Sequence, residues 1–194
     1  MWRVSFVLIL TALLALGASV AHADHGGALK WRSGKSTTPV IVLQPVSLDA
    51  AQLAAVYHGA AAWNDTGYIR YVVAPMVDSY ASAAKGIVPI RSDATLHDFT
   101  SASTERGYLT GSTVHLCPCD SLNKYGVTHE LGHVLGLGHS QGGESVLAPR
   151  IDSSCPGAHD IEELARKYPR DKGRFTVPEG HIYERGGVDC TDYS

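Results

Sequence analysis

The chain has 194 residues, with 16 Lys and Arg against 19 Asp and Glu, so its formal net charge at neutral pH is −3. This balance, without any basic run, argues against a nucleic-acid partner, which would require a basic surface. A chain of this length with 44% hydrophobic residues can bury the core of one compact domain, and we expect a monomer.

Residues 1–23 have the pattern of a secretion signal. Arg3 gives a positive start, residues 4–20 are mostly apolar, and Ala21-His22-Ala23 is a small-residue cleavage site. Cleavage after Ala23 predicts a secreted, extracellular protein (periplasmic in a Gram-negative cell) with no membrane association afterwards. An uncleaved anchor helix is the alternative, but the apolar stretch is short for a span and contains polar residues.

Short strands and one helix are expected in the first half of the remaining chain. The strands are predicted at residues 29–32, 40–43 and 68–73. Between them, Ser47 is a candidate N-cap for a helix that ends near Asn64 and carries one apolar flank.

The next segments are more irregular. Residues 87–91 are predicted to form an edge strand, because Pro89 lacks the N–H that a central strand would use. Residues 92–111 are polar and are expected to be irregular, and residues 113–116 form a short strand. Strands and helices in this order favour a mixed sheet with helices packed on it.

Two helices are expected in the last third of the chain. The first spans residues 123–137. The second spans residues 161–168, with Asp160 as its N-cap and Glu163 three residues later. Residues 169–194 are polar and contain Gly and Pro, which predicts an extension without a core of its own.

The helix at 123–137 carries the motif His129-Glu130-x-x-His133-x-x-Gly136-x-x-His139. Positions i and i+4 lie on one helical face, so His129 and His133 can bind the same ion. Gly136 can end the helix in a left-handed turn, which reverses the chain and brings in His139 as the third ligand.

Three histidine ligands leave one position of a tetrahedral zinc ion open, which is typical of a catalytic site. Glu130 is rotated by about 100° from His129 along the helix, so it is free to act as a general base instead of a ligand. The sequence therefore predicts one catalytic Zn²⁺ held by His129, His133 and His139, with Glu130 as the catalytic residue. A surface helix that happens to be rich in histidine is the alternative.

Four cysteines follow the signal: Cys117, Cys119, Cys155 and Cys190. An even count in an exported chain predicts two disulfide bonds. A Cys117–Cys119 bond would have poor geometry, so each of these two is expected to pair with Cys155 or Cys190. A cysteine-based metal site is the alternative, although the spacing is unusual for zinc.

The segment from Val127 to Ser140 resembles the metzincin clan of zinc endopeptidases, and among them the matrixins (peptidase family M10), in which serine follows the third histidine. The resemblance extends more weakly from Leu29 to Tyr168. It implies an α+β, zincin-like fold, with a twisted five-stranded mixed sheet, about three helices and a small C-terminal subdomain. The domains would be a signal peptide (1–23), a catalytic domain (24–168) and a C-terminal extension tied by a disulfide (169–194).

This resemblance implies a secreted zinc-dependent endopeptidase that hydrolyses internal peptide bonds. The substrate would be a protein or peptide lying extended along the edge strand. The alternatives are a non-catalytic zinc-binding module that recognises proteins, and an enzyme that hydrolyses an amide outside proteins.

Two departures from the family matter. Leu147 stands where metzincins have the methionine of the turn beneath the metal. The family's structural zinc and calcium loops are not recognisable between residues 75 and 111, so structural Ca²⁺ or a second Zn²⁺ stays open. For Asp93, His97 and Asp98 in that stretch, a solvated loop is favoured over a second metal site.

Overall fold

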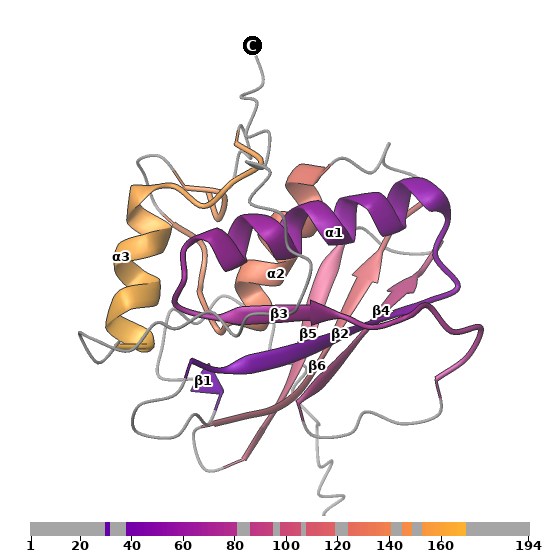
Figure 1. Ribbon diagram of the computed structural model, residues 1–194, viewed down its shortest axis with the longest axis horizontal. Helices are drawn as coiled ribbons and strands as arrows, with labels where there is room; N and C mark the ends of the chain where they lie inside the picture. Colours follow the sequence, from indigo (N-terminus) through magenta and orange to yellow (C-terminus); the bar gives the residue numbers. More distant parts are fainter. Residues whose placement is uncertain are drawn as a thin grey trace, which may run out of the picture.

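The computed structural model describes residues 30–31, 38–80, 86–94, 98–105, 108–118, 124–140, 145–148 and 153–169. The expected signal peptide and nearly all of the expected C-terminal extension lie outside these residues. Figure 1 shows the described elements as one sheet with two helices, α1 and α2, on the same face and a third, α3, beyond one end of the sheet.

The sheet is mixed and mostly parallel. Its strands are β1 (Lys30–Trp31), β2 (Val40–Val46), β3 (Arg70–Val73), β4 (Ile87–Ser92), β5 (Phe99–Glu105) and β6 (Tyr108–Leu116). They are ordered β1-β6-β4-β2-β3 through parallel pairs, and β5 pairs antiparallel with β6. Together with α1 (Ala50–Asp65), α2 (Lys124–Val134) and α3 (Ala158–Lys167), this confirms the α+β class with a mixed sheet and three helices.

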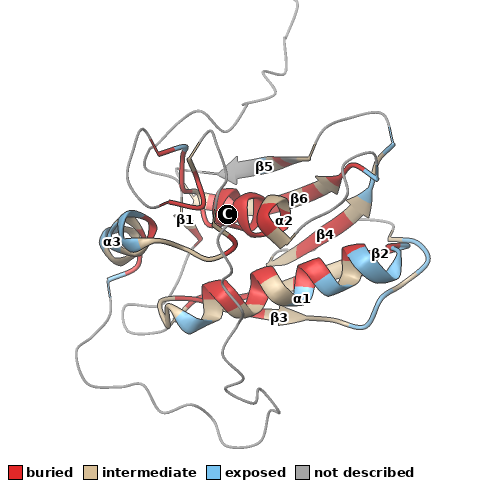
Figure 2. Ribbon diagram, turned by 90° about the horizontal axis from the view of Figure 1, so that it is seen from above, coloured by how far each residue is buried: buried red, intermediate tan, exposed pale blue. Residues whose placement is uncertain are grey.

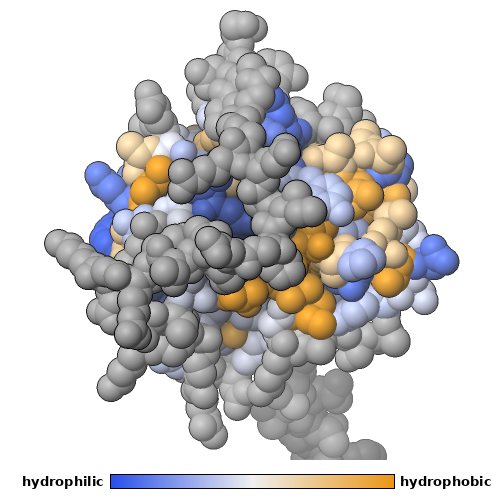
Figure 3. Space-filling model, in the orientation of Figure 1, coloured by the Kyte–Doolittle hydropathy of each residue, from blue (hydrophilic) through white to orange (hydrophobic). Residues whose placement is uncertain are grey.

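The core lies between the sheet and the two helices on its face. Figure 2 shows the buried sides of α1 and α2 turned toward the strands. The fully buried side chains that fill this layer are Ile41, Leu43, Val56, Trp63, Tyr71, Val88, Ile90, Leu116, Leu131 and Leu135. The opposite side of α1 is exposed and rich in alanine, and Figure 3 shows apolar colouring over the right-hand end of that helix. Alanine stabilises a helix even where it makes no contacts.

The prediction that residues 87–91 form an edge strand is wrong. β4 lies between β2 and β6, and Pro89 is opposite Gln44 of β2. The amide of Val42 in β2 donates to the carbonyl of Gly86. In a parallel ladder, the backbone groups of successive residues point alternately to the two neighbouring strands. At Pro89 they point toward β6, and this is where the missing N–H would lie. Pairing with β6 begins only at Ile90, so the proline removes no ladder bond there.

The predicted irregular stretch at 92–111 is also wrong in part. It contains β5 and the first residues of β6, which together form a long antiparallel hairpin. In the described part of the chain, β5 pairs with β6 alone and is therefore an edge of the sheet. Its residues, FTSASTE, are mostly polar, because an edge strand with one solvated face has little need of apolar side chains.

The first helix begins two residues later than predicted. Asp49, not Ser47, is the N-cap: its carboxylate accepts from the amide of Gln52 at 2.7 Å, and the Gln52 side chain accepts from the Asp49 amide at 3.0 Å. Ser47 instead adopts a positive φ of 48° at the turn out of β2. The reciprocal pair satisfies two helix N–H groups that would otherwise lack partners.

Helices α1 and α2 cross at small residues, because larger ones would hold them apart. A methyl group on Gly132 of α2 would lie 2.8 Å from the Trp63 ring of α1 and 2.7 Å from a methyl of Leu147. Both neighbours are fully buried, so a methyl group there requires a neighbour or the helix itself to shift. The Trp63 indole N–H also donates to the carbonyl of Thr128 at 2.8 Å, which fixes the approach of the two helices.

We therefore expect Gly132→Ala to destabilise the fold. Overpacking of a buried site costs about 1–3 kcal/mol, and the better helix propensity of alanine offsets about 1 kcal/mol of that. Urea unfolding of the variant should show a free energy of unfolding up to about 2 kcal/mol below that of the wild type. A variant more stable than the wild type would mean that the helices accommodate the methyl group at a cost smaller than the gain in helix propensity.

Within the described residues, no helix combines the length and the apolar composition that crossing a membrane requires.

Candidate metal centre

Helix α2 places the first two histidines of the motif one turn apart in a buried position. His129 and His133 are 7% and 6% exposed. The helix ends just after them, and Gly136 adopts a φ of 75°, the left-handed turn that the sequence predicts. Its amide donates to the carbonyl of His133 at 2.8 Å. The reversed chain then brings His139, whose side chain is exposed, to the other two rings.

The three rings converge through the same atom. The Nε2 atoms of His129 and His133 are 3.0 Å apart, and each lies 3.2 Å from Nε2 of His139. A tetrahedral zinc ion with Zn–N bonds of about 2.0–2.1 Å holds its ligand nitrogens about 3.3–3.4 Å apart. The observed triangle is therefore close to the size that a single zinc ion requires.

The other ring nitrogens of the two helical histidines are held by backbone carbonyls. Nδ1 of His129 is 2.8 Å from the carbonyl oxygen of Val146, and Nδ1 of His133 is 2.9 Å from that of Leu137. A carbonyl can only accept, so each Nδ1 carries the proton and each Nε2 presents a lone pair. Burial lowers the pKa of His129, which favours the same neutral ring.

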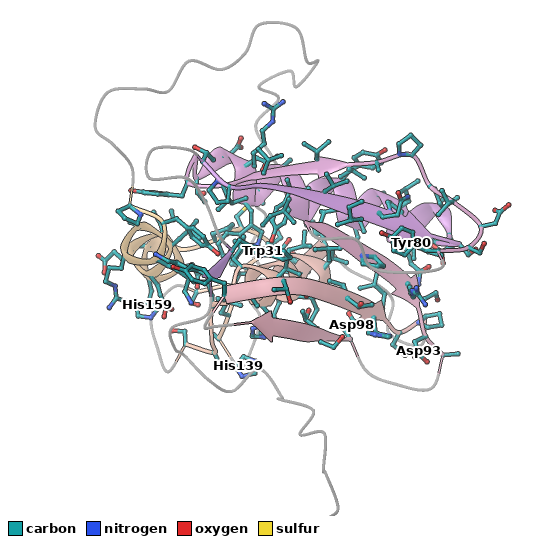
Figure 4. All side chains as sticks on the ribbon, turned by 90° about the horizontal axis from the view of Figure 1, so that it is seen from below. Trp31, Tyr80, Asp93, Asp98, His139 and His159 are labelled. Carbon is teal, nitrogen blue, oxygen red and sulfur yellow. The ribbon has the colours of Figure 1, made fainter. Side chains whose placement is uncertain are left out.

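These observations show that the donor set fits zinc. Converging lone pairs about 3 Å apart repel one another unless a cation lies among them, and imidazole nitrogens suit zinc but not calcium. In the part of the chain that the structure describes, these three histidines form the one group with ligand atoms close enough to hold a metal ion. Figure 4 shows His139 apart from His159, which lies on α3, and from Asp93 and Asp98.

Glu130 lies beside the histidines but does not belong to their group. Its carboxylate is only 6% exposed and accepts a hydrogen bond of 2.6 Å from the hydroxyl of Thr100 on β5. Burial raises the pKa of Glu130 to about 7, the Thr100 hydrogen bond lowers it, and the charge of Asp98 raises it. A buried carboxyl with this pKa suits proton transfer near neutral pH.

The turn at residues 145–148 lies beneath the histidines. Leu147 is fully buried there, against the backbone of Gly132 in the metal helix. The amide of Ser140 donates to the Leu147 carbonyl at 2.9 Å, so the turn also holds the residue that follows the third histidine. The Leu147 side chain thus supports the site by packing, and its carbonyl supports it through the bond from Ser140.

Asp160 anchors this turn, and its role differs from the predicted N-cap. Helix α3 begins at Ala158, so Asp160 is already its third residue. The fully buried carboxylate accepts from the Ser145 hydroxyl at 2.5 Å, from the Val146 amide at 2.8 Å and from the Gly157 amide at 2.9 Å. It therefore joins the start of α3 to the residue whose carbonyl orients His129.

Three further side chains bind the C-terminal end of α2. Its last carbonyls have no helical partners, and each accepts from a distant residue. Trp31 Nε1 donates to Val134 at 2.7 Å, Tyr168 Oη to Leu135 at 3.0 Å, and Lys167 Nζ to Gly136 at 2.5 Å. Sequence reasoning did not find these residues, because such contacts between distant segments leave no local pattern.

The remaining sequence candidates are not part of the site. Asp93 lies 3.5 Å from Nδ1 of His115, and His97 lies outside the described residues. His159 is exposed on α3. The described part of the chain contains no free cysteine, and the pairing of the four cysteines stays a prediction.

Because Leu147 acts by packing, we expect Leu147→Met to have a small effect. The two side chains have similar volumes, and such exchanges usually cost less than about 1.5 kcal/mol. Zinc content measured by atomic absorption should stay unchanged, and any hydrolytic activity should change by only a few-fold. If the wild type is inert and the methionine variant hydrolyses peptides, leucine at this position is incompatible with catalysis.

The sequence matches no protein-family model and no curated protein sequence. Similar solved structures include high choriolytic enzyme 1, a hatching-enzyme zinc protease of the medaka fish Oryzias latipes, at 16% identity and a TM-score of 0.43. That match covers 57% of this chain and spans only half of the hatching enzyme. Another is myroilysin, at 14% identity and a TM-score of 0.47, covering 73% of this chain and 96% of myroilysin.

Proposed function

We propose that this protein is a zinc-dependent endopeptidase that hydrolyses internal peptide bonds, with Glu130 as its general base. The observation that carries the proposal is the convergence of three Nε2 atoms within 3.2 Å of one another, with the buried Glu130 next to His129 in the same helix. A zinc ion bound there supplies a Lewis acid for the scissile carbonyl and for the attacking water.

The protein's own residues do the rest. His129, His133 and His139 hold the metal through Nε2. Glu130 accepts a proton from the attacking water at its carboxylate and passes it to the leaving amine. The carbonyls of Val146 and Leu137 keep the two helical histidines in the tautomer that presents a lone pair.

The edge strand supports a protein or peptide as the substrate. β5 pairs with β6 alone among the described strands, and its neighbour in space is α2, which carries Glu130. An extended peptide can add to such an edge through main-chain hydrogen bonds, which brings its backbone close to the metal centre. In this proposal the protein acts as a monomer. The proposal also places it with the matrixins, because Ser140 follows the third histidine.

The experiment uses the purified chain and a diverse peptide mixture, with and without a chelator. New internal termini found by mass spectrometry, absent with chelator and restored by added zinc, support an endopeptidase. The rival is a non-catalytic zinc-binding module, which the leucine at position 147 favours. That rival predicts one bound zinc ion and no new termini.

Secretion and two disulfide bonds complete the proposal. The absence of a free cysteine among the described residues supports the bonds. We expect the chain recovered from medium to begin at Asp24 and to contain two intramolecular disulfides, each worth about 2–4 kcal/mol of stability. Mass spectrometry of an unreduced digest measures both, and four free thiols or a Cys117–Cys119 bond would contradict the prediction.

A further inference from the structure

Thr100 connects the edge strand to the carboxylate beside the metal centre. It lies on β5 opposite Val114 of β6, and its side chain is 8% exposed. Thr100 is buried and reaches Glu130 of α2 through its hydroxyl, while Ser101, which the alternation of the strand turns to the opposite face, is more exposed. Figure 2 shows β5 running beside α2 along the edge of the sheet.

The contact between Thr100 and Glu130 has two parts. The Thr100 hydroxyl is 2.6 Å from Oε2 of Glu130 and 3.1 Å from the Glu130 backbone oxygen. The hydroxyl has one proton, and the shorter, charge-assisted bond to the carboxylate is the stronger of the two. The threonine therefore holds the Glu130 carboxylate, and its hydroxyl lies close to the Glu130 backbone oxygen as well.

This arrangement leaves one carboxylate oxygen for water. Among the described residues, the Glu130 carboxylate accepts a hydrogen bond at Oε2 and none at Oε1. When one carboxylate oxygen is fixed, the carboxylate cannot rotate freely about the Cγ–Cδ bond of Glu130. Oε1 therefore keeps a constant direction, which a base needs because proton transfer requires a separation of about 2.6–3.2 Å.

We propose that Thr100 is a positioning residue for the general base: its hydroxyl holds Oε2 of Glu130 so that Oε1 faces the attacking water. The inference rests on the proposed function, because it assigns a partner to the base of that reaction. It also ties the strand that would bind the peptide to the group that would activate the water.

Three variants separate this role from a structural one. Thr100→Val keeps the shape of the side chain and removes the hydroxyl, whereas Thr100→Ser keeps the hydroxyl. Thr113→Val is the matched control, since Thr113 lies on the neighbouring strand opposite Ser101 and its side chain is half-buried. Zinc content and the thermal midpoint are measured for each variant.

With a peptide substrate, kcat of Thr100→Val should fall by about 10- to 100-fold, the effect of losing one hydrogen bond to a charged group. KM and zinc content should change by less than twofold. Thr100→Ser should recover most of kcat, and Thr113→Val should match the wild type. The proposal would be overturned if kcat of Thr100→Val stayed within twofold of the wild type. It would also be overturned if Thr100→Ser were as slow as Thr100→Val.

A second readout does not depend on hydrolysis. With ¹³C-labelled glutamate in the zinc-loaded protein, the infrared difference between the wild type and Glu130→Gln isolates the carboxylate band of Glu130. Compared with the wild type, the frequency of that band should shift in Thr100→Val and stay unchanged in Thr100→Ser. An unshifted band in Thr100→Val would show that the hydrogen bond is not made. If the wild type hydrolyses nothing although the band shifts, the proposed function fails together with the positioning role, while the hydrogen bond stands.

Discussion

Replacing Glu130 with glutamine is expected to abolish nearly all peptide hydrolysis while the protein keeps one zinc ion. Glutamine has the same shape and can still accept the hydrogen bond from Thr100, which the structure places at 2.6 Å. It cannot accept a proton from water at neutral pH. Because a positioned general base contributes about 10²–10⁴-fold to a rate, kcat should fall by that factor.

The measurement pairs single-turnover kinetics with zinc analysis of the same sample. Glu162→Gln is the matched control, since Glu162 is exposed on α3 and lies outside the site. The control should retain full activity. A Glu130→Gln variant that keeps more than a tenth of the wild-type rate would exclude Glu130 as the base, and one that loses its zinc would make Glu130 a structural support of the metal.

The metal centre could be predicted because its parts are close together in the sequence. The spacing of His129, His133 and His139, with a left-handed glycine at Gly136, determines the geometry through helix periodicity and one turn. The i and i+4 histidines need no information from the rest of the chain. The structure accordingly brings all three rings together as expected.

The supports of the site could not be predicted in the same way. Thr100 contacts Glu130 across 30 residues, and Trp31 contacts Val134 across 103. Local patterns record which face of an element is buried, but not which distant residue that face meets. Strand β5 was not predicted because its sequence is polar. As an edge strand it depends on pairing with β6 more than on apolar side chains.

The N-cap prediction for Asp160 shows how one residue type can serve two roles. An acidic residue near a helix start is favoured by the helix dipole, which the sequence pattern detects. In the structure, the same carboxylate also reaches outside its helix to Ser145 and Val146. A cap accounts for only the bond to Gly157, so the local pattern predicted the helix and missed the connection to the metal centre.

Removing that carboxylate should have the largest effect on stability of any change considered. Asp160→Ala would leave the Ser145 hydroxyl and the amides of Val146 and Gly157 without their acceptor. Each buried donor that loses its partner costs about 1–3 kcal/mol, and some of this is recovered by water or by shifts of the turn. We expect the free energy of unfolding to fall by about 3–5 kcal/mol.

The same change should weaken zinc binding, which separates Asp160 from an ordinary buried residue. The Val146 amide donates to Asp160 and the Val146 carbonyl orients His129, so a displaced turn misdirects the histidine. Loss of a partner that orients a metal ligand typically costs 10- to 100-fold in metal affinity.

Competition with a chromogenic chelator measures that affinity, and urea unfolding with and without zinc measures stability. Glu162→Ala, on the exposed side of the same helix, should leave both unchanged. If Asp160→Ala loses stability but binds zinc as tightly as the wild type, the turn supports the fold without orienting His129.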